Sequence, residues 1–245
     1  MANNVKKIYG VLGYPVKHSL SPEMHNAAFG HLKIDAEYKL FEVRPPDLDP
    51  FLKNLDKENI YGLNITIPYK ERVLDFVSLD KESQYLRQIK AVNTIVKEAN
   101  TWKGFNTDIP GFFRHLKEHI DPINKKVAIL GAGGAARAVT YVLVNAGASE
   151  IAIFDIDNNK AKELSIMIND LSPKFKITVA QDIGGLDIKN KDLLINATPV
   201  GMEYNHQEIH RPIVILSARL HVGQEVKGSA ARRTADKELV GPPLG

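Results

Sequence analysis

The 245 residues comprise 44% hydrophobic and 25% charged residues, with a net charge of +3, which is an ordinary soluble composition that can form one large or two small cores. No long Lys/Arg run suggests nucleic acid as a partner, and neither a membrane span nor an export signal is present in the pattern. The chain has no cysteine, which excludes disulfides and thiolate metal sites. We expect a cytoplasmic protein without a metal.

Short apolar runs alternate with helical patterns along the first part of the chain. "IYGVLG", "AEYKLFEV" and "GLNITIP" predict strands, whereas "SPEMHNAAFGHL", "DLDPFLKNLD" and "YKERVLDFV" predict helices. This alternation is typical of βαβ units and predicts the α/β class with a largely parallel sheet.

A second α/β series begins at "KKVAILGAGGAARAV" and continues through "DLLINATPVGM". A Gly/Pro-punctuated, amphipathic segment separates the two series. We expect a first domain over residues 1–108, a linker helix region over 109–124 and a second, incomplete domain over 125–227.

After Met202 the pattern weakens, and only residues 213–216 predict a further strand. Residues 228–245 are mostly small, charged or Pro/Gly, a composition that buries too little apolar surface to order a chain. We expect a disordered tail there.

The stretch "NITIPYK" places polar side chains around an apolar strand. Alternation over residues 63–67 puts the apolar side chains on one face and Asn64 and Thr66 on the other. Pro68 predicts the first turn of a helix, so Lys70 would stand where the helix dipole disfavours a cation. A solvated strand face is the simpler interpretation of each residue taken alone.

Three other polar groups make a ligand site the better interpretation. Ser19 and Ser21 stand two residues apart, Ser21 as a candidate N-cap; Asn93 lies in a β-branched strand, and Asp108 lies beside the expected domain boundary. Hydroxyls, amides, an amine and a carboxylate at element ends suit a polyhydroxylated small molecule held in a cleft.

The second series opens with a glycine turn between a strand and a helix. Gly131 would turn the chain, and Gly133 would let backbone N–H groups approach a pyrophosphate at the helix N-terminus. Asp155 ends the next strand, where an acid accepts hydrogen bonds from a ribose. The alternative is a glycine-rich turn without a ligand, but strand, turn, helix and acid in register favour a dinucleotide.

The choice between NAD and NADP stays open at this point. Asp155 and Asp157 favour NAD by charge, because NADP usually needs a cation near its 2′-phosphate. Lys160 or Lys162 could supply that cation if the loop folds back.

Six segments in order resemble the shikimate dehydrogenase family: "GYPVKHSLSPEMHN", "NITIPYKE", "KAVNTIV", "GFNTD", "GAGGAARA" and "NATPVGM". The resemblance covers residues 8 to about 202. It implies an N-terminal substrate-binding α/β domain followed by a Rossmann-type dinucleotide-binding domain. The implied activity is oxidoreduction of 3-dehydroshikimate and shikimate with NADP(H), in the shikimate pathway of aromatic amino acid biosynthesis.

The resemblance also implies roles for individual residues. Lys70 and Asp108 would form the catalytic pair. The substrate contacts would be Ser19, Ser21, Thr66, Asn93 and, more weakly, Asn64. The cofactor contacts would be Gly131, Ala132, Gly133, Gly134, Ala135, Asp155, Thr198 and Met202.

Two alternatives remain beside this function. The acids at 155 and 157 suit an NAD-dependent enzyme acting on quinate or shikimate. The family pattern is not found after residue 202, which predicts a truncated, weakly active chain or a non-catalytic ligand-binding relative. In each case the expected partner is a small molecule, and the expected assembly is a monomer or homodimer.

Overall fold

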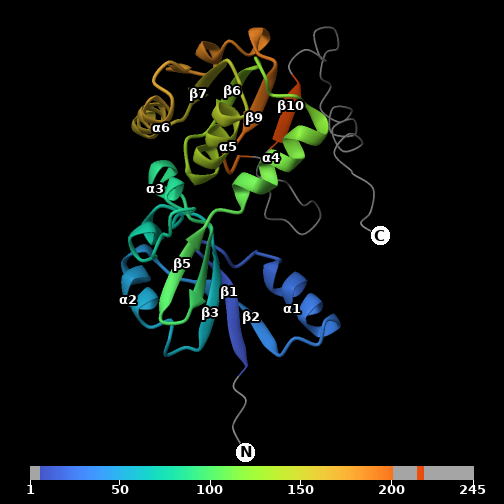
Figure 1. Cartoon of the computed structure of the whole chain (residues 1–245), viewed down its shortest axis with the longest axis vertical. Helices are drawn as coiled ribbons and strands as arrows, with labels where there is room; N and C mark the ends of the chain where they lie inside the picture. The colour runs from blue at the N-terminus through green and yellow to red at the C-terminus, as the bar shows by residue number, and fades with distance from the viewer. Residues whose placement is uncertain (1–5, 201–213, 218–245) are drawn as a thin grey trace, which may run out of the picture.

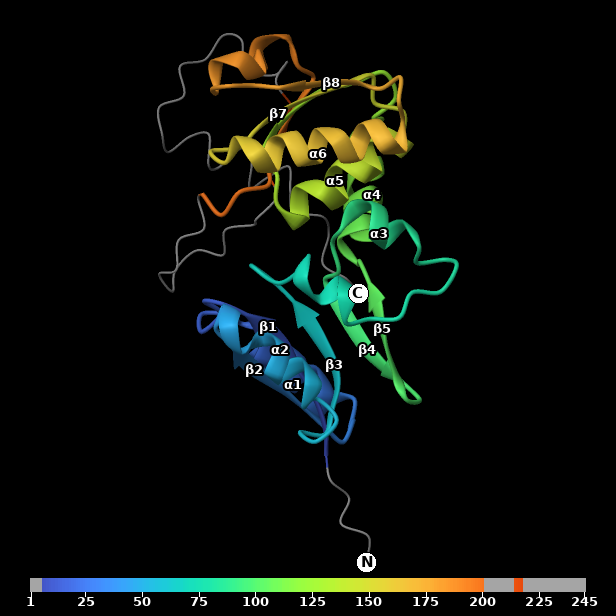
Figure 2. The same cartoon turned by 90° about the vertical axis from the view of Figure 1, so that its left-hand side faces the viewer.

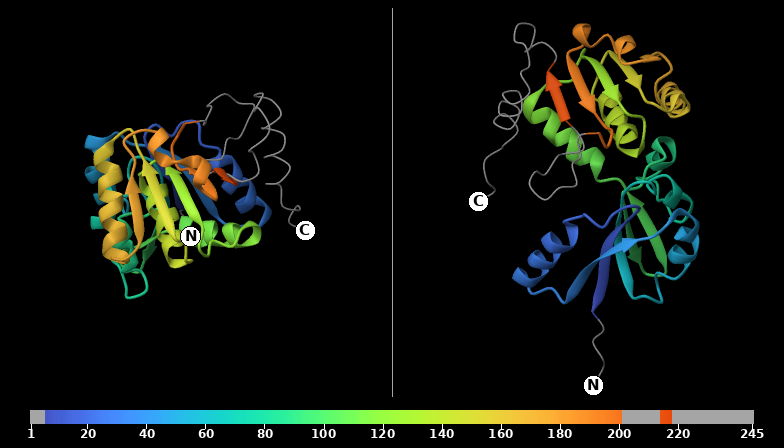
Figure 3. Two further views of the ribbon diagram at one scale, coloured as in Figure 1. Left: turned by 90° about the horizontal axis from the view of Figure 1, so that it is seen from above. Right: turned by 180° about the vertical axis from the view of Figure 1, so that it is seen from behind.

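The computed structural model describes residues 6–200 and 214–217, which form two five-stranded sheets with helices packed on them. The two sheets lie one above the other, and helix α4 (Asp108–His119) leads from the first to the second (Figure 1). The α/β class expected from the sequence is confirmed. The view from behind shows the same two layers (Figure 3).

The first sheet has the strand order β2-β1-β3-β4-β5. Its strands are β1 (Lys7–Gly13), β2 (Ala36–Glu42), β3 (Ile60–Ile65), β4 (Thr94–Glu98) and β5 (Thr101–Phe105). The first three are parallel, whereas β4 runs antiparallel to both β3 and β5. The sheet is largely parallel, as expected, and β4 is the one reversed strand; the two-residue connection between β4 and β5 permits only a hairpin.

Successive side chains of β1 pack into the hydrophobic cores on opposite faces of this sheet, because side chains alternate along a strand. Val11 packs with Tyr38 on the side that carries α1 (Ser21–His31). Leu12 packs with the buried leucines of α2 (Leu48–Lys53) on the other side. The third helix of this unit, α3 (Tyr85–Ile89), lies against the helices of the second unit.

The second sheet has the order β10-β9-β6-β7-β8. Its strands are β6 (Lys126–Leu130), β7 (Glu150–Phe154), β8 (Lys176–Val179), β9 (Leu193–Asn196) and β10 (Val214–Ser217). All pairs are parallel except β10 with β9. The order β8-β7-β6-β9 is that of a doubly wound Rossmann-type sheet, with its switch point between β6 and β9. The strand expected at 213–216 is present as β10, one residue later.

Helices α5 (Gly134–Asn145) and α6 (Asn158–Leu171) pack together on the second sheet (Figure 2). Helix α5 also contacts α4, and α3 of the first unit contacts both α5 and α6. Tyr85 of α3 stacks on Tyr141 of α5 with 5.5 Å between ring centroids. The two units therefore meet through α3 and α5 as well as through the chain at α4.

The prediction that a helix begins at Pro68 is wrong. Residues 68–71 form turns, and the helical turn that follows is a 3-10 turn over Arg72–Asp75. The Lys70 carbonyl accepts a hydrogen bond from Val92 N–H at 2.7 Å, so a distant segment takes the bond that a helix would have used. Ile67 lies beyond the end of β3 and is 53% exposed.

Two smaller expectations also change. Ser21 is the first residue of α1 rather than its N-cap, and Leu20 takes the cap position. The tail expected over 228–245 lies outside the described residues. Among the residues described, no helix is long and apolar enough to cross a membrane.

Candidate active site

Lys70 and Asp108 form an ion pair between segments that are distant in the chain. Lys70 Nζ donates to Asp108 Oδ2 at 2.6 Å. The two side chains are 17% and 27% exposed, which limits solvent screening of their interaction. Lys70 comes from the turn after β3, and Asp108 is the first residue of α4. The pair thus lies where the first unit passes into the second.

Asn93 binds the other oxygen of the Asp108 carboxylate. Its amide Nδ2 donates to Asp108 Oδ1 and to the Thr107 hydroxyl, each at 2.9 Å. Its Oδ1 accepts from Thr107 N–H at 2.8 Å. Asn93 is 8% exposed, so this buried amide is satisfied by the site itself.

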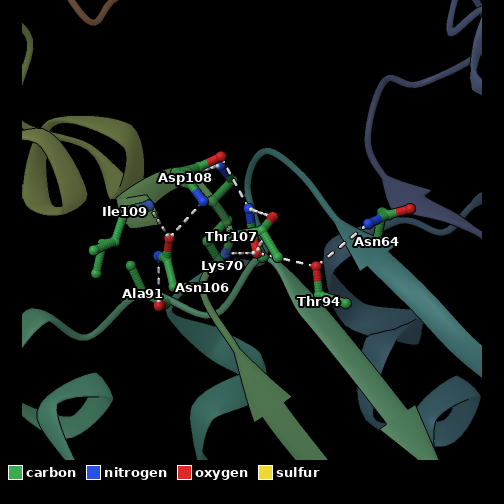
Figure 4. A network of polar contacts seen from close by, with 9 residues as sticks. Asn64, Lys70, Ala91, Thr94, Asn106, Thr107, Asp108 and Ile109 are labelled. Carbon is green, nitrogen blue, oxygen red and sulfur yellow. Dashed lines mark hydrogen bonds and ion pairs between the residues drawn. The ribbon is translucent and has the colours of Figure 1, made fainter. Parts of the chain in front are cut away.

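Asn106 fixes the start of α4 and hence the position of Asp108. Asn106 Oδ1 accepts from the N–H groups of Asp108 and Ile109 at 3.0 and 3.3 Å. Its Nδ2 donates to the Ala91 carbonyl at 2.9 Å (Figure 4). The side chain therefore satisfies helix N–H groups that would otherwise lack a partner, as a capping residue does.

The polar network continues along the ends of the strands. Asn64 lies opposite Thr94 in the β3–β4 register and donates to its hydroxyl at 3.3 Å. The Thr94 hydroxyl donates to Asn93 Oδ1 at 3.0 Å, and the Tyr38 hydroxyl donates to Asn64 Oδ1 at 2.7 Å. Hydrogen bonds therefore connect Tyr38 in β2 with the ion pair at α4.

The two serines lie at the Tyr38 end of this network. The Ser19 hydroxyl donates to that of Ser21 at 3.0 Å, and Ser21 N–H donates to the Ser19 hydroxyl at 3.3 Å. Burial raises the pKa of Tyr38 to about 12, and a hydrogen bond with Ser21 offsets part of that rise. Tyr38 therefore stays a neutral hydroxyl at physiological pH.

Thr66 is the predicted substrate contact that stands outside the network. Its N–H donates to the Leu12 carbonyl at 2.9 Å, and its methyl group lies against Gly13. Within the part of the chain that the structure describes, its hydroxyl has no hydrogen-bond partner, so it is available to a ligand.

Sequence reasoning did not single out Tyr38, Thr94, Asn106 or Thr107. Thr94 is next to Asn93 and Thr107 is next to Asp108. Thr94, Asn106 and Thr107 all fall within the quoted "KAVNTIV" and "GFNTD" segments. No sequence pattern indicates Tyr38 as a site residue, because its hydrogen bond with Asn64 depends on strands β2 and β3 lying on either side of β1.

The glycine turn follows β6 at the switch point of the second sheet. Gly131 has φ +97°, and a Cβ there would lie 2.9 Å from both the Ala197 carbonyl oxygen and Thr198 Cγ2. Only glycine fits this turn, for both reasons. Thr198, a predicted cofactor contact after β9, thus lies beside the turn.

Asp155 lies against the same turn. Its Oδ2 accepts from Ala132 N–H at 2.7 Å, and its Oδ1 accepts from Asp157 N–H at 2.8 Å. A Cβ on Gly133 would have no atom within 4 Å, so space is open above the N-terminus of α5. An acid, an open glycine and a helix N-terminus suit a dinucleotide.

The three remaining predicted cofactor residues have different surroundings. Ala135 lies in the first turn of α5. Gly134 faces Lys70 instead of open space, since a Cβ there would meet the lysine stem at 3.1 Å. Met202 lies outside the described residues.

Comparison with known proteins gives the same picture. Residues 11–95 match the family model described as the shikimate dehydrogenase substrate binding domain. The NADP(+) shikimate dehydrogenase of Carboxydothermus hydrogenoformans is 42% identical over 209 residues, covering 84% of this chain and 72% of that protein.

Two solved structures share the fold. A shikimate dehydrogenase in complex with NADP+ gives a TM-score of 0.70 at 35% identity, covering 85% of this chain and 72% of that one. Shikimate 5-dehydrogenase of Listeria monocytogenes, in complex with shikimate and NAD, gives 0.68 at 32% identity, covering 83% and 72%.

A Lys–Asp pair beside a Rossmann-type glycine turn defines the class of two-unit α/β oxidoreductases. Within that class, the chain belongs to the shikimate dehydrogenase family.

Proposed function

We propose that the protein interconverts 3-dehydroshikimate and shikimate with a nicotinamide dinucleotide. The observation that carries the proposal is the 2.6 Å pair of Lys70 and Asp108, placed beside the glycine turn of the second sheet. Family membership supports it, since the relatives are named for this activity.

The residues of the pair divide the acid–base work. When bound, the nicotinamide donates or accepts the hydride. Lys70 supplies the proton that the ketone oxygen needs on reduction, and its charge stabilises the developing alkoxide. Asp108 orients the ammonium and accepts a hydrogen bond from a substrate hydroxyl.

The strand-end polar groups bind the substrate in this proposal. Asn93, Asn64 and the hydroxyl of Thr66 hold the ring hydroxyls. Ser19 and Ser21 hold the carboxylate. Several directed hydrogen bonds of this kind give a hydroxylated acid its orientation.

The cofactor proposed first is NADP(H), because the relatives in two organisms are named as NADP(+) enzymes. A specific observation favours NAD as the second candidate. The Asp155 carboxylate is bonded to Ala132 N–H, which places a negative charge beside the turn where a 2′-phosphate would be repelled. Lys160 and Lys162, in the first turns of α6, are the residues that could compensate.

The test is the change in reduced-nicotinamide absorbance with shikimate or quinate, each with NAD and NADP. Lys70→Ala should lower kcat by a factor of about 10² to 10⁴ and change substrate binding far less. Lys39→Ala is the matched control, since Lys39 pairs with Glu37 on an exposed surface. Binding of shikimate without any turnover would favour the ligand-binding alternative instead.

Three parts of the proposal rest on the sequence. They are the division into a substrate-binding domain (1–108), a linker region (109–124) and a dinucleotide-binding domain (125–227), the monomer or homodimer assembly, and the cytoplasmic location.

A further inference from the structure

The first turn of α5 contacts the Lys70 segment at Gly134. A Cβ placed on Gly134 would lie 3.1 Å from both Cβ and Cδ of Lys70 and 3.6 Å from Cγ. The bare Cα of Gly134 therefore faces the methylene stem of the lysine. This glycine belongs to the second unit, whereas Lys70 follows β3 of the first.

One helical turn further on, Arg137 contacts the residue next to Lys70. Arg137 Nε lies 3.3 Å from Glu71 Oε1, and its Nη2 donates to Glu163 Oε2 at 3.2 Å. The arginine side chain is 3% exposed, whereas the two glutamates are 45% and 61% exposed. Arg137 thus joins α5, α6 and the Lys70–Glu71 segment.

We propose that Gly134 and Arg137 are positioning residues for Lys70. Gly134 gives the lysine stem a surface to lie on, and Arg137 holds Glu71 so that the backbone of Lys70 stays in register. The inference rests on the proposed catalytic role of Lys70.

The physical reason is the flexibility of lysine. Its ammonium stands on a four-carbon stem that only packing can fix, and an error of about 1 Å at a reacting group can cost about 10² in rate. Helix α5 also packs on α4, whose first residue is Asp108. One helix of the cofactor unit therefore supports both members of the ion pair.

Gly134→Ala tests the steric half. Alanine at the start of a helix does not weaken the helix, so the melting temperature should stay equal or rise. We expect kcat to fall by a factor of about 10 to 100, while affinity for the reduced cofactor, measured by its fluorescence on binding, changes by less than about 3-fold. The control is Gly111→Ala in α4, where a Cβ meets nothing within 4 Å.

Glu71→Gln and Arg137→Met test the ionic half as a double-mutant cycle on kcat. If both residues act on Lys70 through their contact, the double variant should be no slower than the slower single variant. Arg137→Lys keeps a charge and should restore part of the rate. The Glu71 side chain is 45% exposed, so its variant should fold even if Arg137→Met does not.

The outcomes separate this inference from the proposed function. Turnover retained in Lys70→Ala would overturn both. An inactive Lys70→Ala together with unchanged kcat in Gly134→Ala and Glu71→Gln would overturn the positioning role alone. Loss of cofactor affinity in Gly134→Ala equal to the loss in kcat would also overturn it, because the glycine would then serve the cofactor.

Discussion

Asn93 and Lys70 bind opposite oxygens of the same carboxylate. Asn93 Nδ2 donates to Asp108 Oδ1 at 2.9 Å, and Lys70 Nζ donates to Oδ2 at 2.6 Å. The carboxylate therefore has its plane fixed from two sides, which aligns the ammonium with whatever group it protonates.

Asn93→Ala should lower kcat by about 10-fold, because it frees Asp108 to rotate and leaves Thr107 N–H without its acceptor. Steady-state kinetics with shikimate measure the effect. Asn54→Ala is a matched control, since the Asn54 side chain donates to the Pro50 carbonyl at an exposed helix end, far from the site. A variant of Asn93 with normal kcat would show that the Asp108 carboxylate keeps its position without Asn93.

Tyr38→Phe removes the hydroxyl that donates to Asn64 at 2.7 Å. We expect KM for shikimate to rise about 2- to 10-fold, the cost of one hydrogen bond, with kcat nearly unchanged. The pKa of Tyr38 is raised to about 12, so it should play no part in the pH dependence of activity near neutrality. A large drop in kcat would contradict this binding-only role.

Asp155→Ser removes the negative charge beside the glycine turn and should raise affinity for NADP relative to NAD by about 10-fold or more. Titration of both reduced cofactors by fluorescence measures the ratio without turnover. Asp187→Ser is the control, since Asp187 bonds to Asn190 on the surface. An unchanged ratio would mean that Asp155 only supports the turn through Ala132 N–H.

The ion pairs of Glu150 should make the protein less stable in acid. Hydrogen bonds from Lys176 and Lys191 lower the pKa of Glu150 from 4.5 to about 2. The unfolded chain then binds the proton more tightly than the folded one, so the free energy of unfolding falls as pH drops from about 5 towards 2. We expect this group to contribute on the order of 2 kcal/mol above pH 5.

Chemical denaturation of the wild type and of Glu150→Gln at a series of pH values measures that contribution. The variant should be less stable at neutral pH, because Lys191 is 6% exposed and would lose its charged partner. The two proteins should converge as the pH approaches 2. If the free energies of unfolding of the two proteins ran parallel over the whole pH range, Glu150 would not be the group whose protonation lowers stability in acid.

The sequence predicted the second sheet well and the first less well. In the glycine turn, local residue choice fixes the structure, since Gly131 adopts a positive φ and Gly133 is the N-cap of the following helix. The helix prediction for the segment around Lys70 was wrong, because its conformation depends on a hydrogen bond from Val92, a residue far along the chain. Local signals such as Pro68 are overridden when a distant segment supplies the hydrogen bonds.

The candidate site shows the same division. The sequence singled out Lys70, Asp108 and Asn93, and the structure brings them together. It did not indicate Tyr38, nor the contacts of Gly134 and Arg137 with the Lys70–Glu71 segment. Those contacts follow from strand order and from the packing of one unit on the other, which no short pattern encodes.

Asp108 is both a site residue and the first residue of α4, and this dual position makes the chain length between Phe105 and Asp108 critical. Each residue of an α-helix turns its direction by about 100°. One inserted residue after Asn106 would turn α4 and carry the Asp108 carboxylate away from Lys70, and the same turn would move Phe112 and Leu116 out of the core. Insertions here should lower both activity and stability, whereas the hairpin between β4 and β5 should accept them.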